Sequence, residues 1–313
     1  MSRNKALCLC LLFLAGCGPK FTYPADSVPK AVEDICRNEN NLVVSARVVG
    51  KTVGAMITIE DLLDDKGQIP KQVHEKMGQI MQAVTRVALS TDRPIDFCVV
   101  VIRDRAHKNE LIITRSLEDT KRANSDAIGV EESINRTLFG QGKYQASPEG
   151  ENTFVMKEVK LESFLADQIA QRVRLNFVKD SKEDSAQPFV LVDGIFDNSP
   201  EGRRFRFSVL SLKAAEPRDV MLTVFHTVNE VLEGYHFTEF NQIEILDYLN
   251  RQKLTVDRQT LMDFQAKKIS DQAILDKYLT ESQSIQEAFK LFGFNLTDAP
   301  TDADAPPIAP TTP

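Results

Sequence analysis

The sequence is poor in the residues from which most enzyme sites are built. Its four histidines, His74, His107, His226 and His236, are scattered, and no two of them have the spacing that places two ligands on one helix face. It contains no His-Glu-x-x-His, no Cys-x-x-Cys, no phosphate-binding loop and no Gly-x-Ser-x-Gly elbow. Glycine, which phosphate-binding loops require, is scarce at 14 residues. These absences predict no catalytic residue, no cofactor and no metal ligand, although distant residues can still assemble a site.

Positive charge is also in the minority. The chain has 38 Lys and Arg against 45 Asp and Glu, which gives a net charge of −7. A chain this acidic lacks the basic surface that binding to nucleic-acid phosphates requires, so we expect no nucleic-acid partner. The same acidity provides no electrostatic attraction to anionic lipid.

Long hydrophobic runs are missing as well. The apolar run Ala6–Phe13 has eight residues, far fewer than the roughly 20 that a membrane span needs. Arg3 and Lys5 precede this run, and small residues follow it. A basic start, a short apolar middle and small residues at the end are typical of a secretory signal peptide.

The run ends in Leu14-Ala15-Gly16-Cys17, which resembles the lipobox of bacterial lipoproteins. The resemblance implies that Cys17 receives a thioether-linked diacylglycerol, that the chain is cut before it, and that the new N-terminus is acylated. The lipid would then anchor the protein to a membrane. The alternatives are an ordinary signal peptide with an unrelated cysteine, or a buried cysteine. Because Gly18 rather than Asp follows the cysteine, the resemblance implies the periplasmic face of the outer membrane in a host with two membranes.

Removal of residues 1–16 would leave 297 residues, enough for two domains, and would change the net charge to −9. Cys8 and Cys10 would leave with the signal peptide. Cys36 and Cys98 would then be the remaining thiols. An exported compartment permits a disulfide between them, and two buried free thiols are the alternative.

The first half predicts alternating helices and strands. The expected elements are a helix over Ser27–Arg37, a hairpin of Leu42–Val49 and Val53–Ile59, a helix over Val73–Ala88, strands at Ile95–Ile102 and Leu111–Thr114, and a helix capped by Ser116 with Asp119. The strand Ile95–Ile102 is apolar on both faces, which predicts an interior strand covered by helices.

An acidic segment follows the predicted hairpin. Thr58 and Asp61 have the spacing of a capping box, which predicts a helical turn directly after the strand. Asp61, Asp64 and Asp65 suggest calcium, but the loop pattern of an EF-hand is absent. A solvent-exposed acidic turn is therefore the favoured interpretation.

The second half repeats the first. Its expected elements are a helix over Leu161–Val173, a hairpin of Phe189–Phe196 and Phe205–Leu212, and a helix over Met221–Leu232. Six apolar residues from Met77 to Ala88 recur 144 positions later, and residues from Phe97 to Arg115 recur 143 positions later. We therefore predict an α+β fold, a tandem duplication of an α-β-β-α-β-β-α module whose antiparallel-rich sheet packs on helices.

These patterns also predict the domain boundaries. The polar segment Gly129–Lys157, with a short helix over Glu131–Leu138, separates the copies, and additional helices starting at Ser270 and Ser284 extend the second copy. The expected segments are the signal peptide 1–16, a lipidated tether 17–26, copy 1 at 27–146, a linker 147–158, copy 2 at 159–297, and a disordered Pro/Ala/Thr tail 298–313.

Two charged residues are repeated along with the apolar pattern. Asp104 recurs as Asp247, and Arg115 recurs as Arg258. If each Asp and Arg lie across a hairpin from one another, a structural ion pair explains them.

Three classes of function stay open at this level. The first is a non-catalytic envelope scaffold or assembly subunit that binds other proteins. The second is a binder of a ligand or of peptidoglycan in a groove between the copies, and the third is an enzyme. The layout resembles ring-forming lipoproteins of bacterial secretion systems, which also have a lipidated cysteine and two small α/β domains. The modules predicted here have an additional strand and share no motif with that family.

Overall fold

The chain forms two compact units that divide between Val159 and Lys160. The computed structural model describes residues 21–144, 153–179, 190–200, 202–211, 217–281 and 291–292. The lipobox Leu14–Cys17, the helix expected from Ser284 and the tail 298–313 lie outside these residues. We call the two parts unit 1 and unit 2 and describe each by itself.

Unit 1 is an α+β module built on a five-stranded sheet. Its elements are α2 (Val28–Asn40), β1 (Ser45–Val49), β2 (Thr52–Ile59), α3 (Lys71–Leu89), β3 (Phe97–Asp104), β4 (Asn109–Ser116), α4 (Leu117–Asn124), α5 (Val130–Asn135) and β5 (Leu138–Lys143). The strand order is β1-β2-β3-β4-β5. Strands β2 and β3 are parallel, and all other neighbours are antiparallel.

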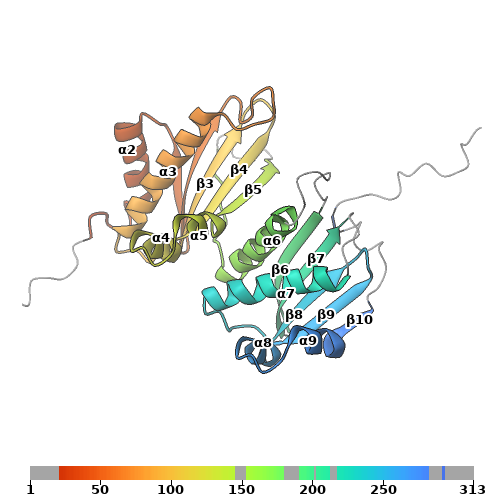
Figure 1. Ribbon diagram of the computed structural model, residues 1–313. Helices are drawn as coiled ribbons and strands as arrows, with labels where there is room; N and C mark the ends of the chain where they lie inside the picture. Colours follow the sequence, from red (N-terminus) through yellow and green to blue (C-terminus); the bar gives the residue numbers. More distant parts are fainter. Residues whose placement is uncertain are drawn as a thin grey trace, which may run out of the picture. The chain divides into compact units, whose positions relative to one another are not determined.

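The core of unit 1 lies between the sheet and two helices. Helices α2 and α3 cover one face of the sheet (Figure 1). The apolar stripe of α3, which includes Met77, Ile80 and Val84, is buried there. Every residue of β3 is buried, which confirms the prediction of an interior strand. Cys36 and Cys98 are free thiols in this core, so the disulfide alternative is wrong.

Unit 2 has the same element order and the same topology. Its elements are α6 (Leu161–Lys179), β6 (Val190–Ser199), β7 (Gly202–Ser211), α7 (Pro217–Gly234), β8 (Gln242–Asp247), β9 (Gln252–Asp257), α8 (Arg258–Gln265), α9 (Asp271–Tyr278) and β10 (Leu279–Glu281). The strand order is β6-β7-β8-β9-β10, again with the second and third strands parallel.

The strand register confirms that the two units are similar modules. Ile59 pairs with Asp104 in unit 1, and Val209 pairs with Asp247 in unit 2, which keeps the predicted offset of 143 between the two aspartates. Val84 and Val228, the predicted equivalent core positions, are both fully buried. The α+β class and the duplication are therefore as predicted.

Each unit is longer than the predicted module by one helix and one strand. Strand β5 in unit 1 and strand β10 in unit 2 complete the two sheets. The helix that begins after Ser270 is α9, and its side-chain cap is present because the Ser270 hydroxyl accepts a hydrogen bond from the Ala273 N–H. Since α5 occupies the same place in unit 1, α9 belongs to the repeat and is not an extension of copy 2.

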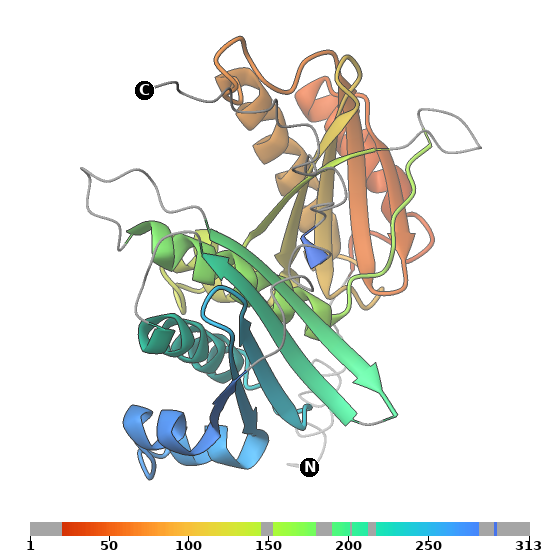
Figure 2. The same cartoon turned by 90° about the vertical axis from the view of Figure 1, so that its right-hand side faces the viewer.

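Residues 153–159, which lie between β5 and α6 in the sequence, pack on the second face of the first sheet (Figure 2). Phe154 packs there against Met56, Val99 and Val101. Gly54 permits this approach, because a Cβ at that position would lie 2.5 Å from the Met156 sulfur. The described end of the expected linker 147–158 is thus part of unit 1 and is not a free loop.

Two local capping predictions fail. No helical turn follows Thr58, because residues 60–70 form a loop that contains Gly67 at a φ of +72° and Pro70 before α3. Helix α4 begins after Ser116 as predicted, but the Ser116 side chain makes no capping hydrogen bond. Across the described residues, the helices are too short or too polar to span a bilayer.

Candidate functional site

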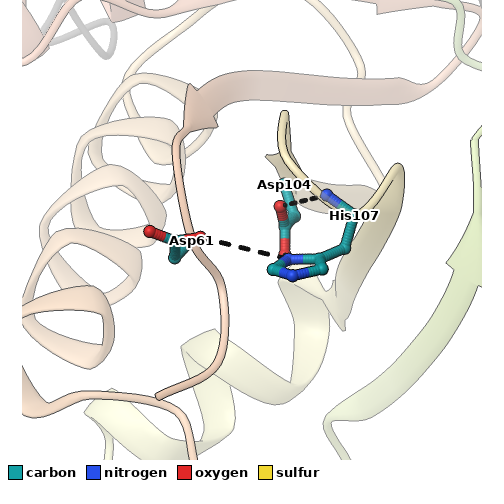
Figure 3. Close-up of side chains that lie close together, drawn as sticks. All are labelled: Asp61, Asp104 and His107. Carbon is teal, nitrogen blue, oxygen red and sulfur yellow. Dashed lines mark hydrogen bonds and ion pairs between the residues drawn. The ribbon is translucent and has the colours of Figure 1, made fainter. Parts of the chain in front are cut away.

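The first candidate is the carboxylate of Asp104 at the end of β3. This side chain is buried, and its Oδ1 accepts a hydrogen bond from the His107 backbone N–H at 2.9 Å. Its Oδ2 lies 3.0 Å from His107 Nδ1 and accepts from the Leu62 N–H at 3.2 Å (Figure 3). Burial raises the pKa of this carboxyl, but the hydrogen bonds from His107 and Leu62 outweigh burial, so its pKa lies below the ordinary value.

Unit 2 repeats this turn with a different partner. Asp247 Oδ1 accepts from the Asn250 N–H at 3.2 Å, and Oδ2 accepts from Asn250 Nδ2 at 2.7 Å. An aspartate therefore closes the turn after the third strand in both units. This shared structural role explains why the residue is repeated.

The predicted ion pairs of Asp104 with Arg115 and of Asp247 with Arg258 are wrong. Arg115 pairs in register with Cys98, at the opposite end of the hairpin from Asp104. The Arg115 Nε donates to Thr137 Oγ1 at 3.2 Å, and Arg258 Nη1 donates to the Thr238 carbonyl at 3.1 Å. The long hairpins keep each guanidinium several residues away from its expected partner.

Asp61, Asp104 and His107 are the group of described residues whose ligand atoms lie close enough to hold one metal ion, within 4.8 Å of one another. They border an acidic hollow of about 1010 Å³. The oxygens of Asp104 already accept hydrogen bonds in the turn, and Asp61 and His107 are exposed. The turn explains this arrangement without a metal.

The contacts of Asp61, Asp64 and Asp65 are those of an exposed turn. Asp64 Oδ1 accepts hydrogen bonds from the backbone N–H groups of Lys66 and Gln68, both at 2.9 Å. Asp64 thus stabilises its own turn. The three carboxylates do not form a ligand group within the described residues, and the exposed acidic turn is what the structure contains.

The second candidate is a groove on the helix side of unit 1, which we call the α3 groove. Its volume is about 730 Å³. Helix α3 forms one wall, α4 the other, and β4 and β5 the floor. The lining residues are His74, Met77, Gly78, Met81, Gln82, Thr85, Arg86, Leu89, Ser90, Ile113, Arg115, Thr120, Asn124, Thr137 and Phe139.

Arg115 is the principal charge on the floor of this groove. Burial lowers its pKa, and the nearby Cys98 and Asp119 oppose that effect. Asp119 is itself held by Arg136, whose Nη1 lies 3.0 Å from Asp119 Oδ1. No carboxylate of the described residues lies within ion-pair distance of the Arg115 guanidinium.

Apolar surface is exposed around and beside the groove. Phe139 on β5 and Leu89 at the end of α3 both line it, and their exposed fractions are 49% and 38%. Helix α5, which precedes β5, exposes Val130 and Ile134 on one face. Among the described residues, strand β5 pairs with β4 alone and forms the edge of the sheet. Exposed apolar residues beside the edge strand of a sheet are typical of surfaces that bind other proteins.

The structure places the predicted lipidation residue and the four histidines as follows. Cys17 lies outside the described residues. His107 lies in the Asp104 turn and His74 in the α3 groove, whereas His226 contacts Asp271 at 2.8 Å and His236 follows α7. The α3 groove was not predicted, although a comparison of the two copies would have shown smaller residues in copy 1, such as Gly78 for Leu222.

Comparisons with known proteins add little to this picture. No protein-family model matches the chain, and no curated protein matches it. Among solved structures, the crystal structure of the sex pheromone staph-cAM373 precursor is similar at 8% identity over 67% of each chain, with a TM-score of 0.18. A TM-score this low carries no argument about fold or function.

Proposed function

We propose that this chain is a lipid-anchored cell-envelope lipoprotein, a non-catalytic scaffold or assembly subunit that binds other proteins. The lipobox Leu14–Cys17 supports the anchor. Lipid is required for anchoring because the mature chain, with a net charge of −9, has no general attraction to anionic membranes. We place the protein at the periplasmic face of the outer membrane if its host has two membranes.

The observation that carries this proposal is the open apolar surface of unit 1. The α3 groove is lined by apolar residues, among them the partly exposed Phe139 and Leu89, and it borders β5, which is the edge strand of the sheet among the described residues. Partner proteins bind such surfaces by adding a strand to the edge or by placing apolar side chains in the groove. Small-molecule sites are more often enclosed.

The absence of catalytic motifs in the sequence supports a role without catalysis. His107 and Asp104 are an acid–base pair of the kind that catalysis uses, but their contacts close a turn that unit 2 builds with Asn250. A neutral amide can replace the imidazole there because the role is to donate a hydrogen bond.

The proposal is tested by formaldehyde cross-linking in intact cells, using the full-length lipidated chain. We expect discrete protein adducts that migrate above the band of the lipidated monomer. A chain that stays monomeric contradicts the proposal. Sedimentation with purified cell-wall sacculi, without protein adducts, would instead support the alternative, a ligand- or peptidoglycan-binding lipoprotein.

A further inference from the structure

The two units allow an internal comparison at the α3 groove. Ala123 in unit 1 corresponds to Phe264 in unit 2, because each accepts, through its carbonyl, the N–H of a residue with left-handed φ three positions later. Those residues are Asp126 and Lys267, with φ of 56° and 57°. The offset between Ala123 and Phe264 is 141 residues, and the same offset aligns Val130, at the start of α5, with Asp271, at the start of α9.

In unit 2, the protein's own side chains occupy the position that corresponds to the α3 groove. The Phe264 ring meets Phe225 of α7 edge-on at 5.0 Å and stacks on His226 at 5.7 Å. His226 Nε2 lies 2.8 Å from Asp271 Oδ1, which ties α7 to α9. An aromatic ring and a carboxylate, both supplied by the chain itself, therefore close this side of unit 2.

Unit 1 lacks both groups. Met81 stands where unit 2 has Phe225, Ala123 where it has Phe264, and Val130 where it has Asp271. Gly78 replaces Leu222, and a Cβ built at Gly78 meets no atom within 4 Å. Among the described residues of unit 1, no side chain takes the place that Leu222 and Phe264 fill in unit 2.

The charged residues that line the α3 groove also favour binding of an external ligand. Although the chain is acidic overall, the described residues that line this groove include Arg86, Arg115 and His74 and no Asp or Glu. Arg86 is bound by Glu39, with both carboxylate oxygens at 2.9 Å. Arg115, on the floor, donates to a neutral hydroxyl. A ligand with a carboxylate would supply the charge that the groove lacks.

We infer that the α3 groove binds a segment of a partner protein that presents a large apolar or aromatic side chain next to a carboxylate. The side chain would take the place that Phe264 fills in unit 2, and the carboxylate would face Arg115. From His74 to Ser90 the helix wall is about 24 Å long, enough for about seven residues of extended chain. This inference rests on the proposed function and specifies the partner's chemistry.

The test uses a photo-cross-linking amino acid, benzoylphenylalanine, placed in the full-length lipidated chain. Gln82 lines the groove and Gln79 does not, although both are exposed and lie three residues apart on α3. We expect a protein adduct from position 82 and none from position 79. Sequencing of the cross-linked peptide should show a large apolar or aromatic residue beside Asp or Glu.

Arg115→Gln should reduce the adduct at position 82 by about tenfold or more, because a hydrogen bond to a charged group is lost. Arg115→Lys should retain most of it. Circular dichroism of both variants checks that the fold is kept. An unchanged adduct with Arg115→Gln, or a cross-linked peptide that is basic and polar, would overturn the inference.

The outcome also separates this inference from the proposed function. If formaldehyde adducts form in cells but position 82 yields none, the protein binds partners elsewhere and the inference is wrong. If no protein adduct forms by either method, the proposed function itself is wrong.

Discussion

Replacing Val84 with Asp is expected to unfold unit 1 while unit 2 keeps its thermal transition. Val84 is fully buried in the core between α3 and the first sheet, so a carboxylate placed there would be removed from solvent. Burying an unpaired carboxylate costs several kcal/mol, against a stability of about 5–15 kcal/mol for a whole domain. Calorimetry of the full-length chain should therefore show one transition lost or strongly lowered.

The control for this substitution is Gln79→Asp, on the exposed side of the same helix. Surface changes of this kind usually alter stability by no more than about 0.5 kcal/mol. Val228→Asp should have the reciprocal effect, because Val228 is the equivalent buried position in unit 2. Simultaneous collapse of both transitions in Val84→Asp would mean that the two units share one cooperative core.

Replacing Cys17 with Ala is expected to abolish labelling by a fatty-acid analogue completely. The thiol of Cys17 is the atom to which the lipid would be attached, so no smaller effect is expected. The variant should also accumulate unprocessed or appear in the soluble fraction. Without acyl chains, which contribute about 0.8 kcal/mol per buried CH₂, this acidic chain should not be retained at the membrane.

Cys10→Ala provides the matched control, because Cys10 lies within the signal peptide and should leave with it. That variant should label and fractionate like the unaltered protein. Continued labelling and membrane association of Cys17→Ala would contradict the lipoprotein proposal. In that case the remainder of the chain must attach to the membrane by another route.

The sequence predicted the parts of the fold that depend on buried periodic patterns. The stripe of α3 fixes which face of the helix is buried, and β3, which is apolar on both faces, can lie only in the interior of the sheet. Their recurrence as α7 and β8 revealed the duplication. The offsets count directly because the elements that carry the core tolerate few insertions.

The elements that the sequence does not predict are those with few buried side chains. Strand β5 contains Gly140 and Gly142, and all but the first of its residues are exposed, so no alternating pattern marks it. Phe154 and Met156 were assigned to a polar linker because the surrounding residues are polar. Their burial depends on Gly54, about a hundred residues earlier, which no local pattern indicates.

The predicted ion pairs failed for a similar reason. The repeat correctly marked Asp104 and Asp247 as equivalent, but it contained no information on their partners, which lie three residues further along the chain. No sequence motif marks the α3 groove, because the groove arises where unit 1 has smaller side chains than unit 2. The alignment of the two copies, with Gly78 at the place of Leu222 and Ala123 at the place of Phe264, makes that deficit visible.

The central claim is that unit 1 binds its partner in the groove that unit 2 closes with its own side chains. The most direct test gives unit 1 the residues of unit 2, as Gly78→Leu with Ala123→Phe. Replacing a helical glycine by leucine favours the helix by up to about 1 kcal/mol, so the unit 1 transition should be unchanged or higher.

The measurement is the yield of formaldehyde adducts in cells for this double variant, with Gln79→Leu as the control that adds a leucine to α3 outside the groove. We predict that the filled groove abolishes the adducts and that the control keeps them. Adducts at the unaltered yield, formed by a folded protein with the groove filled, would contradict the claim.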